Sequence, residues 1–286
     1  MNILLITYRR LEHVAKIIDS LSHENVKFYV YSNAWNDKDS EQDVKIVRSV
    51  IRDKISEGKV YKVFWNKVYL PVEHSIPFAV DWFFNQVDCG LVLEDDCVVN
   101  EGAYQIISML FSSIQNKDLK HINLHNKIDF GFLNIEDRRL DTVKLVSVWG
   151  WISNSYTWNT ANCDINVNLS NYLKSFDGSG ISRFHALIYF FLYLLNKYNL
   201  IKSWDFIYAA RIICSGAEVV QVYPSLITSK GLDKYSTNHK FNHELNIDPS
   251  KVPFGFEYDS YLLKNLYSKM LFKINFRRIK NLFSRI

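Results

Sequence analysis

Short apolar runs alternate with longer amphipathic segments through the first part of the chain. The runs are rich in β-branched and aromatic residues, which predicts strands, and the segments between them repeat apolar residues at helical spacing. The predicted strands cover residues 2–7, 27–32, 59–64 and 90–96. The predicted helices cover residues 13–22, 40–57, 75–86 and 101–114, the third with Pro77 in its first turn, where proline is tolerated. Strand alternating with helix indicates an α/β fold with a mainly parallel sheet flanked by helices.

The second half of the chain has a less regular pattern. An apolar helix is predicted over residues 184–195, with a length suited to a core or an interface rather than to a membrane span. A further helix is predicted to open with Ser203 as its N-cap, to end near Gly216 and to be followed by a strand. Because there is no internal repeat and no flexible linker, we expect a single domain over residues 1–258, followed by a tail of residues 259–286.

The positive charge lies in that tail. The whole chain has a net charge of +4, and residues 261–286 contribute +7, which leaves −3 for the rest and argues against nucleic acid as a partner. One helical face of the tail is apolar and the other basic: Phe276, Ile279, Leu282, Phe283 and Ile286 against Arg277, Arg278, Lys280 and Arg285. This pattern predicts a helix lying in the plane of an anionic membrane surface over residues 276–286. A terminal helix docked on the domain or on a partner subunit is the alternative.

The cysteine spacing and the N-terminal sequence indicate the cellular compartment in which the protein is expected. The four cysteines form no CxxC pair, which favours free thiols in a reducing compartment. The first apolar run precedes its positive charges, the reverse of a signal peptide. We therefore expect a cytoplasmic protein, peripheral on the inner face of the cell membrane.

Three consecutive acids, Glu94, Asp95 and Asp96, end the fourth predicted strand. Adjacent carboxylates repel one another, and burying them is costly unless positive charge lies among them. Such carboxylates can hold Mn²⁺ or Mg²⁺, with diphosphate oxygens as further ligands. In a parallel sheet, ligands bind beyond the carboxyl ends of the strands. Polar residues follow the first two predicted strands at the same edge: Thr7, Tyr8, Arg9, Arg10, Ser32 and Asn33. A solvated acidic turn is the alternative for the acids.

Other residues are candidates for a role in catalysis or binding, and each also has a purely structural explanation. Asp205 falls in a first helical turn, where the helix dipole favours a carboxylate, yet a carboxylate at a pocket edge can also act as a general base. The tryptophans around Gly150 can stack on a sugar ring or fill the core: Trp149, Trp151 and Trp158. His239 and His243 lie in a polar loop that can be solvated or can contact a diphosphate or a metal.

Five segments in order resemble a family of bacterial GT-A glycosyltransferases, nucleotide-diphospho-sugar transferases distantly similar to N-acetylglucosaminyltransferase I. The resemblance covers roughly residues 1–245. The segments are "TYRRLEHVAKIIDSL", "YSNAWND", "FAVDWFFNQVDCGLVLEDDCVV", "WGWISNSYTW" and "SWDFIYAARIICSGAEVVQVYPSLITSKGLDKYSTNH". The third is the closest match, because the family typically has "AIDWFFE" followed by "GIILEDDC". The resemblance implies a Rossmann-like GT-A domain with a nucleotide-binding half near residues 1–100 and an acceptor half near 101–258.

The resemblance also implies roles. Asp96 would ligate a divalent cation, and Asp205 would deprotonate the acceptor hydroxyl in a single inverting displacement. The donor would contact Thr7, Tyr8, Arg10, Asn33, Asp95 and Lys230, the last near the diphosphate, where His239 is a further candidate. The acceptor would contact Trp149, Gly150, Trp151 and Trp204. Two departures affect the donor: the family aspartate that would favour uracil is Asn33, and "YLPVEH" at 69–74 lacks the family glycine.

The function implied is a metal-dependent inverting hexosyltransferase that moves a sugar, with a UDP-sugar as the favoured donor, onto a lipid-linked surface glycan such as a capsule or lipopolysaccharide. A nucleotidyltransferase is a weaker alternative, because "TYRRLEH" contains no glycine for a phosphate loop. The non-enzymatic alternative is a catalytically degenerate domain kept for assembly at the membrane.

Overall fold

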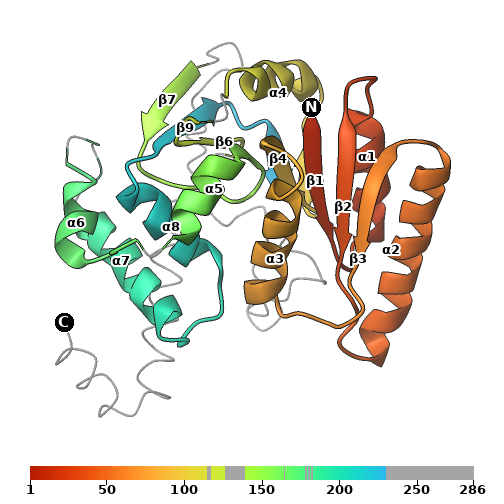
Figure 1. Ribbon diagram of the computed structural model, residues 1–286, viewed down its shortest axis with the longest axis horizontal. Coiled ribbons are helices and arrows are strands. Elements are labelled where there is room, and N and C mark those ends of the chain that lie inside the picture. The colour runs from red at the N-terminus through yellow and green to blue at the C-terminus, as the bar shows by residue number, and fades with distance from the viewer. Residues whose placement is uncertain are drawn as a thin grey trace, which may run out of the picture. The chain divides into compact units, whose positions relative to one another are not determined.

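The computed structural model describes residues 1–114, 117–125, 139–163, 165–177, 179, 181 and 183–229 (Figure 1). These residues belong to one compact unit. Within these ranges no helix has both the length and the apolar character needed to cross a membrane. The predicted domain limits and the tail of residues 259–286 remain predictions, and the tail lies outside the described residues.

The main sheet has eight strands in the order β3-β2-β1-β4-β8-β6-β9-β7. Its strands are β1 (Asn2–Thr7), β2 (Lys27–Ser32), β3 (Val60–Trp65), β4 (Cys89–Glu94), β6 (Lys120–Asn123), β7 (Arg139–Val143), β8 (Trp151–Asn154) and β9 (Glu218–Tyr223). The first four run parallel, as does the β6–β9 pair. Strand β8 is antiparallel to β4 and to β6, and β7 is antiparallel to β9. The predicted α/β class with a mainly parallel sheet is confirmed, and the antiparallel strands come from the less regular second half.

Helices cover both faces of this sheet. They are α1 (Leu11–Leu21), α2 (Lys38–Ser56), α3 (Val72–Phe84), α4 (Ala103–Ser112), α5 (Ser155–Asn162), α6 (Leu169–Lys174), α7 (Arg183–Lys197) and α8 (Asp205–Cys214). Alternate residues of β1 enter two separate apolar clusters, Ile3 and Leu5 with α1, α2 and α4, and Leu4 and Ile6 with α3, α5 and α8. Successive strand side chains point to opposite faces, so a strand buried on both sides is continuously apolar, as "NILLIT" is.

Two helix starts give a named residue a different position from the predicted one. Helix α3 begins at Val72, so Pro77 lies in its second turn rather than its first. There, proline removes the N–H that would bond to the carbonyl of Glu73, and the apolar face of α3 in the core holds the helix together across this gap. Ser203 is not the N-cap of α8: Trp204 is, and the Ser203 hydroxyl donates to the carboxylate of Asp205 instead. The predicted end near Gly216 is confirmed, with φ of 77° at that glycine.

A second, two-stranded sheet lies beside the acid cluster. Strand β5 (Cys97–Val99) pairs antiparallel with β10 (Ile227–Ser229), and Cys97 is opposite Ser229. Glu94 therefore ends β4, while Asp95 and Asp96 form the turn between β4 and β5. A segment more than 120 residues later in the chain thus reaches the residue after Asp96.

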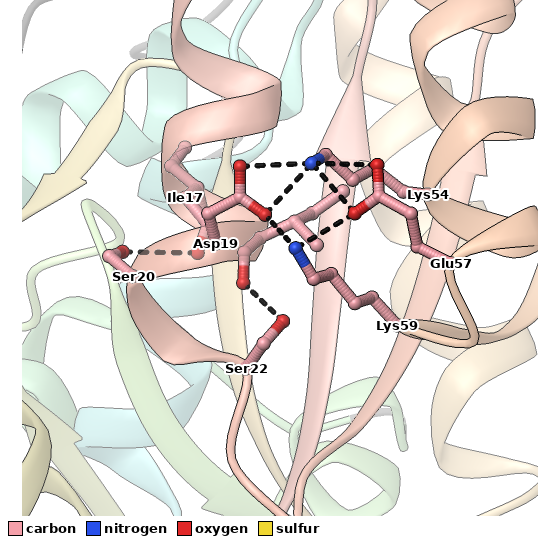
Figure 2. Close-up of polar contacts among 8 residues, drawn as sticks. Ile17, Asp19, Ser20, Ser22, Lys54, Glu57 and Lys59 are labelled. Carbon is pink, nitrogen blue, oxygen red and sulfur yellow. Dashed lines mark hydrogen bonds and ion pairs between the residues drawn. The ribbon is translucent and has the colours of Figure 1, made fainter.

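On the surface, four charged groups join α1, α2 and the start of β3. Figure 2 shows the ammonium groups of Lys54 and Lys59 between the carboxylates of Asp19 and Glu57. Hydrogen bonds to Asp19 and Glu57 raise the pKa of Lys54 and of Lys59. Because all four groups are solvated, this network adds little stability and is screened by salt. Like many surface ion pairs it positions helix ends and has no link to the candidate site.

Candidate functional site

The carboxyl ends of four parallel strands meet at one edge of the sheet. Thr7 at the end of β1 is opposite Ser32 at the end of β2, which is opposite Trp65 at the end of β3. On the other side, Ile6 is opposite Glu94 at the end of β4. The segments that follow β1, β2 and β4 therefore lie together, where parallel α/β sheets bind ligands.

Asp95 ties the segment after β4 to the segment after β1. Its Oδ2 accepts a hydrogen bond of 2.7 Å from the backbone N–H of Tyr8, and its Oδ1 lies 2.9 Å from Nη1 of Arg10. Its own carbonyl is 3.1 Å from Nδ1 of His13. The carboxylate is buried, and it is paired by charge and by a backbone donor, which offsets its desolvation. His13 was not identified from the sequence, where it falls within a predicted helix.

Glu94 and Asp96 carry charge that Arg10 only partly offsets. Burial, followed by repulsion from Asp96 and Asp95, raises the pKa of Glu94 well above its usual value, against the opposing effect of Arg10. Burial raises the pKa of Asp96 as well, although Arg10 Nη1 lies 3.5 Å from its Oδ2. Three carboxyl groups thus lie together at the end of β4, and the guanidinium group of Arg10 pairs with two of them. Further positive charge at this edge would relieve the repulsion.

The donor set fits a divalent cation that is held partly by substrate. In the described part of the chain, no three His, Cys, Asp or Glu side chains converge in a metal-binding arrangement. Mg²⁺ and similar ions are commonly held by one or two carboxylates plus substrate phosphates, which does not require three protein ligands. The buried, repelled carboxylate of Asp96 suits that arrangement.

Asn33 has a different set of contacts from the one that a base-reading residue needs. Its Nδ2 donates to the carbonyl of Leu70 at 2.7 Å, and its Oδ1 accepts from the backbone N–H of Leu70 at 3.2 Å. The same Oδ1 also accepts from the N–H of Ala34 and from Nδ2 of Asn66. The side chain is buried, so its polar atoms anchor the loop after β3 to the end of β2. An aspartate could not donate to the Leu70 carbonyl, which gives a structural reason for the amide at this position.

Arg48 of α2 supports the same loop and was not identified from the sequence. Its guanidinium group donates to three carbonyls at the ends of β2 and β3, those of Ser32, Asn33 and Asn66. Its Nε donates to the hydroxyl of Ser32. Nothing in the local sequence distinguishes Arg48 from Arg52, because both follow the helical period of α2.

The remaining donor-side residues line the same edge. Thr7 is buried, and its hydroxyl donates to the carbonyl of Tyr31. The Tyr8 hydroxyl donates to Oδ1 of Asn36, and its ring lies 5.9 Å from that of Tyr69. Thr7 thus fixes the strand end, while Tyr8 and Tyr69 form an aromatic pair beside Asp95.

Asp205 is the first residue of α8, close enough to the acid cluster to affect it. Its negative charge adds a smaller repulsive contribution that raises the pKa of Glu94. The Asn196 side chain donates to the carbonyl of Ser203, which fixes the segment that leads into α8. The fold therefore brings together two acidic sites that lie 109 residues apart in the sequence.

The predicted acceptor residues divide into buried and half-buried positions. Trp151 has no exposed surface and Trp204 is 8% exposed, so in this structure neither presents a ring face to a sugar. Trp149 is half-buried and meets the ring of His125 edge-on at 5.1 Å. Gly150 has φ of 71°, and a Cβ there would come within 2.1 Å of Ile227 Cδ1, so close packing against β10 requires glycine.

Lys230 and His239 lie outside the described residues, as does His243. Ser229, the residue before Lys230, is opposite Cys97, the residue after Asp96. Two of the hollows that the described residues outline lie elsewhere. One, of about 520 Å³, runs along α2 from Lys38 to Ser49, and the other, of about 170 Å³, lies beside β7 and β9.

No protein-family model and no curated protein sequence matches the chain. Among solved structures, it is similar to S. aureus TarS residues 1–349, with 10% identity, 79% of this chain and 58% of that chain covered, and a TM-score of 0.43. It is also similar to the glycosyltransferase GlyE of Streptococcus pneumoniae, at 14% identity, 94% and 63% coverage and a TM-score of 0.36. A third is the mannosyltransferase PcManGT of Pyrobaculum calidifontis, solved with GDP-Man and Mn²⁺, at 9% identity, 46% and 36% coverage and a TM-score of 0.34.

The second of these structures is named as a glycosyltransferase and the third as a mannosyltransferase. The chain spans less than two thirds of each of the three. At TM-scores below 0.5 the similarity by itself assigns neither a donor nor a reaction to this chain.

Proposed function

We propose that this protein is a metal-dependent inverting glycosyltransferase that takes a sugar from a nucleotide-diphosphate donor. The observation that carries the proposal is the set of three carboxyl groups and one guanidinium group at the carboxyl edge of the parallel strands, with Asp205 near them. The five motifs in order, including "LEDD", support it from the sequence.

Each group has a chemical role in this proposal. Asp96 would hold a Mn²⁺ or Mg²⁺ ion, which when bound neutralises charge on the departing diphosphate. The donor-binding edge is held together by the contacts among Asp95, Tyr8 and Arg10. Further contacts to the diphosphate would come from Lys230 and His239. Asn33 would act by holding the loop after β3 rather than by reading the base.

The transfer step is a single displacement. Asp205 accepts the proton of the acceptor hydroxyl while the acceptor oxygen bonds to the anomeric carbon and the bond from that carbon to the diphosphate oxygen breaks. A base on the side opposite the leaving group gives inversion at that carbon. Trp149 and Gly150 would border the acceptor, and we propose a lipid-linked glycan as its class, with residues 276–286 attaching the protein to the cytoplasmic face of the membrane.

Thermal unfolding with UDP, GDP, CDP and dTDP, each with Mn²⁺ or with EDTA, tests the proposal. A ligand at about 100 times its Kd stabilises the folded state by about 2.7 kcal/mol, a shift of several degrees. We expect one nucleotide to stabilise the wild type only with metal, and Asp96→Asn to lose that effect. Asp53→Asn, an exposed carboxylate on α2, is the matched control. If no nucleotide changes the unfolding temperature, the domain is a degenerate transferase.

A further inference from the structure

Helix α7 has an apolar outer face in addition to its apolar inner face. The inner face, with Ala186, Phe190 and Tyr193, packs into the core that it shares with α8. The outer stripe is Phe184, Leu187, Ile188, Phe191 and Tyr198, at spacings of three, four and seven residues. Phe184 is 68% exposed, Leu187 43% and Tyr198 40%. The helical hydrogen-bond pattern extends to Tyr198, whose N–H bonds to the carbonyl of Leu194. Leu195, between Phe191 and Tyr198, is only 5% exposed, so the exposed part of the stripe is concentrated at Phe184 and Leu187 and resumes at Tyr198.

A helix that is apolar all round is normally buried on all sides. With 15 residues, α7 is too short to cross a bilayer, and its inner face is already committed to the core. Its outer face therefore has the length and composition of a segment that lies in an interface rather than through one.

Most of the charged side chains around this face are basic. Between residues 165 and 204 the sequence holds four basic residues, Lys174, Arg183, Lys197 and Lys202, and one acid, Asp177. The side chains of Arg183 and Lys202 are 80% and 78% exposed, and Lys197 is exposed as well. Asp177 lies 3.6 Å from Arg183, and Glu73 of α3 lies 3.9 Å from Lys202, so two of the four basic charges have an acidic partner.

We propose that the outer face of α7, continued by Tyr198 and Leu200, lies on an anionic membrane surface with its apolar stripe in the headgroup region. The basic residues at its margins match anionic headgroups, which attract lysine and arginine side chains near such a surface. A second copy of this chain would oppose the same face with the same positive charges, which disfavours a symmetric dimer through it. The proposal concerns residues 184–200 alone and does not involve residues 276–286.

This placement gives α7 a functional consequence that rests on the proposed function. Helices α7 and α8 pack against each other (Figure 1), and seven residues separate Lys197 from Asp205. A membrane-bound α7 would hold the start of α8, and with it the candidate base, close to the lipid surface. A lipid-linked acceptor would also lie at the membrane surface.

Co-sedimentation of the full chain with vesicles tests the surface without donor, metal or turnover. We expect binding to phosphatidylcholine vesicles that contain phosphatidylglycerol, and weaker binding as salt screens the charges. The double variant Phe184→Gln with Leu187→Gln keeps helix-forming residues and should bind about tenfold more weakly. Met109→Gln changes a side chain that is 73% exposed on α4 and should bind like the wild type.

A fluorophore attached through Leu187→Cys, with Cys163→Ser to remove the exposed thiol, separates this surface from the tail. A blue shift on anionic vesicles supports the proposal, and bound protein with no shift assigns attachment to the tail and overturns it. Unchanged binding of the double variant also overturns it. The proposal is also overturned if the wild-type protein does not bind vesicles but forms a dimer that the double variant does not form. Vesicle binding without any nucleotide response would reject the proposed function alone.

Discussion

Arg10 and Asp95 form an ion pair of 2.9 Å between the segments that follow β1 and β4. Both side chains are largely buried, and the same Asp95 carboxylate accepts from the Tyr8 backbone. Breaking one partner of a buried pair leaves the other charge uncompensated, so the cost exceeds the value of the pair itself.

Asp95→Asn should therefore lower the free energy of unfolding by about 2–3 kcal/mol. It should also weaken nucleotide binding, because the loop after β1 loses its anchor. Urea denaturation measures the first effect and thermal shift with nucleotide the second. Asp43→Asn breaks the more exposed Arg9–Asp43 pair and should cost less than about 1 kcal/mol. Equal costs for the two variants would contradict the buried role of Asp95.

Asn33→Asp separates a positioning role from base recognition. The substitution removes the donor to the Leu70 carbonyl and places negative charge against it, which should cost about 2–3 kcal/mol of folding free energy. The order of preference among UDP, GDP, CDP and dTDP should not change. A reversed nucleotide preference with unaltered stability would show instead that residue 33 contacts the base.

Asp205→Asn tests whether this carboxylate acts on the acceptor. As a general base it should lower the turnover of a competent donor–acceptor pair by about 10²–10⁴-fold while leaving nucleotide affinity unchanged. If the carboxylate only interacts with the helix dipole, its loss should lower the free energy of unfolding by about 0.5 kcal/mol and leave the turnover rate unchanged. Ser203→Ala, which removes the hydroxyl bonded to Asp205, controls for loss of local structure.

His121 makes the stability of the sheet dependent on pH. It is fully buried in β6, where Nε2 donates to the Ser147 carbonyl and Nδ1 accepts from the Tyr208 hydroxyl. Burial lowers its pKa from 6.5 to about 4. In the unfolded chain this histidine binds a proton below about pH 6.5, whereas in the folded chain it binds one only below about pH 4. The free energy of unfolding therefore falls as the pH falls through this window.

Between pH 7 and pH 5 the loss from this group should be about 2 kcal/mol, measured by urea denaturation at the two pH values. His121→Gln lacks the titrating group and should show a correspondingly smaller difference between them. An identical pH dependence in the two proteins would mean that other groups account for the loss.

Local sequence patterns were enough to predict the first half of the fold. Strands β1, β2 and β4 are apolar runs because both of their faces are buried, and α1, α2 and α4 repeat apolar residues at the helical period. Strand β3 lies at the sheet edge and is more exposed, yet its β-branched and aromatic residues still marked it as a strand. Parallel strands with short βα connections also put their carboxyl ends at one edge, so the meeting of Tyr8, Arg10 and Asp95 followed from the order of elements.

The second half of the fold and the surroundings of several site residues depend on contacts between distant segments. A local sequence pattern does not indicate which distant segment will cover a residue or form a hydrogen bond with it. The insertion of β8 between β4 and β6, and the pairing of β5 with β10, join segments that share no local signal. Whether Trp151 faces a ligand or the core depends on the helices packed over it, and the core surrounds it. The anchoring of Asn33 to Leu70 depends on the loop after β3, which no pattern around residue 33 indicates. The charge of Asp205 acts on Glu94 only because α8 returns to the edge where β4 ends.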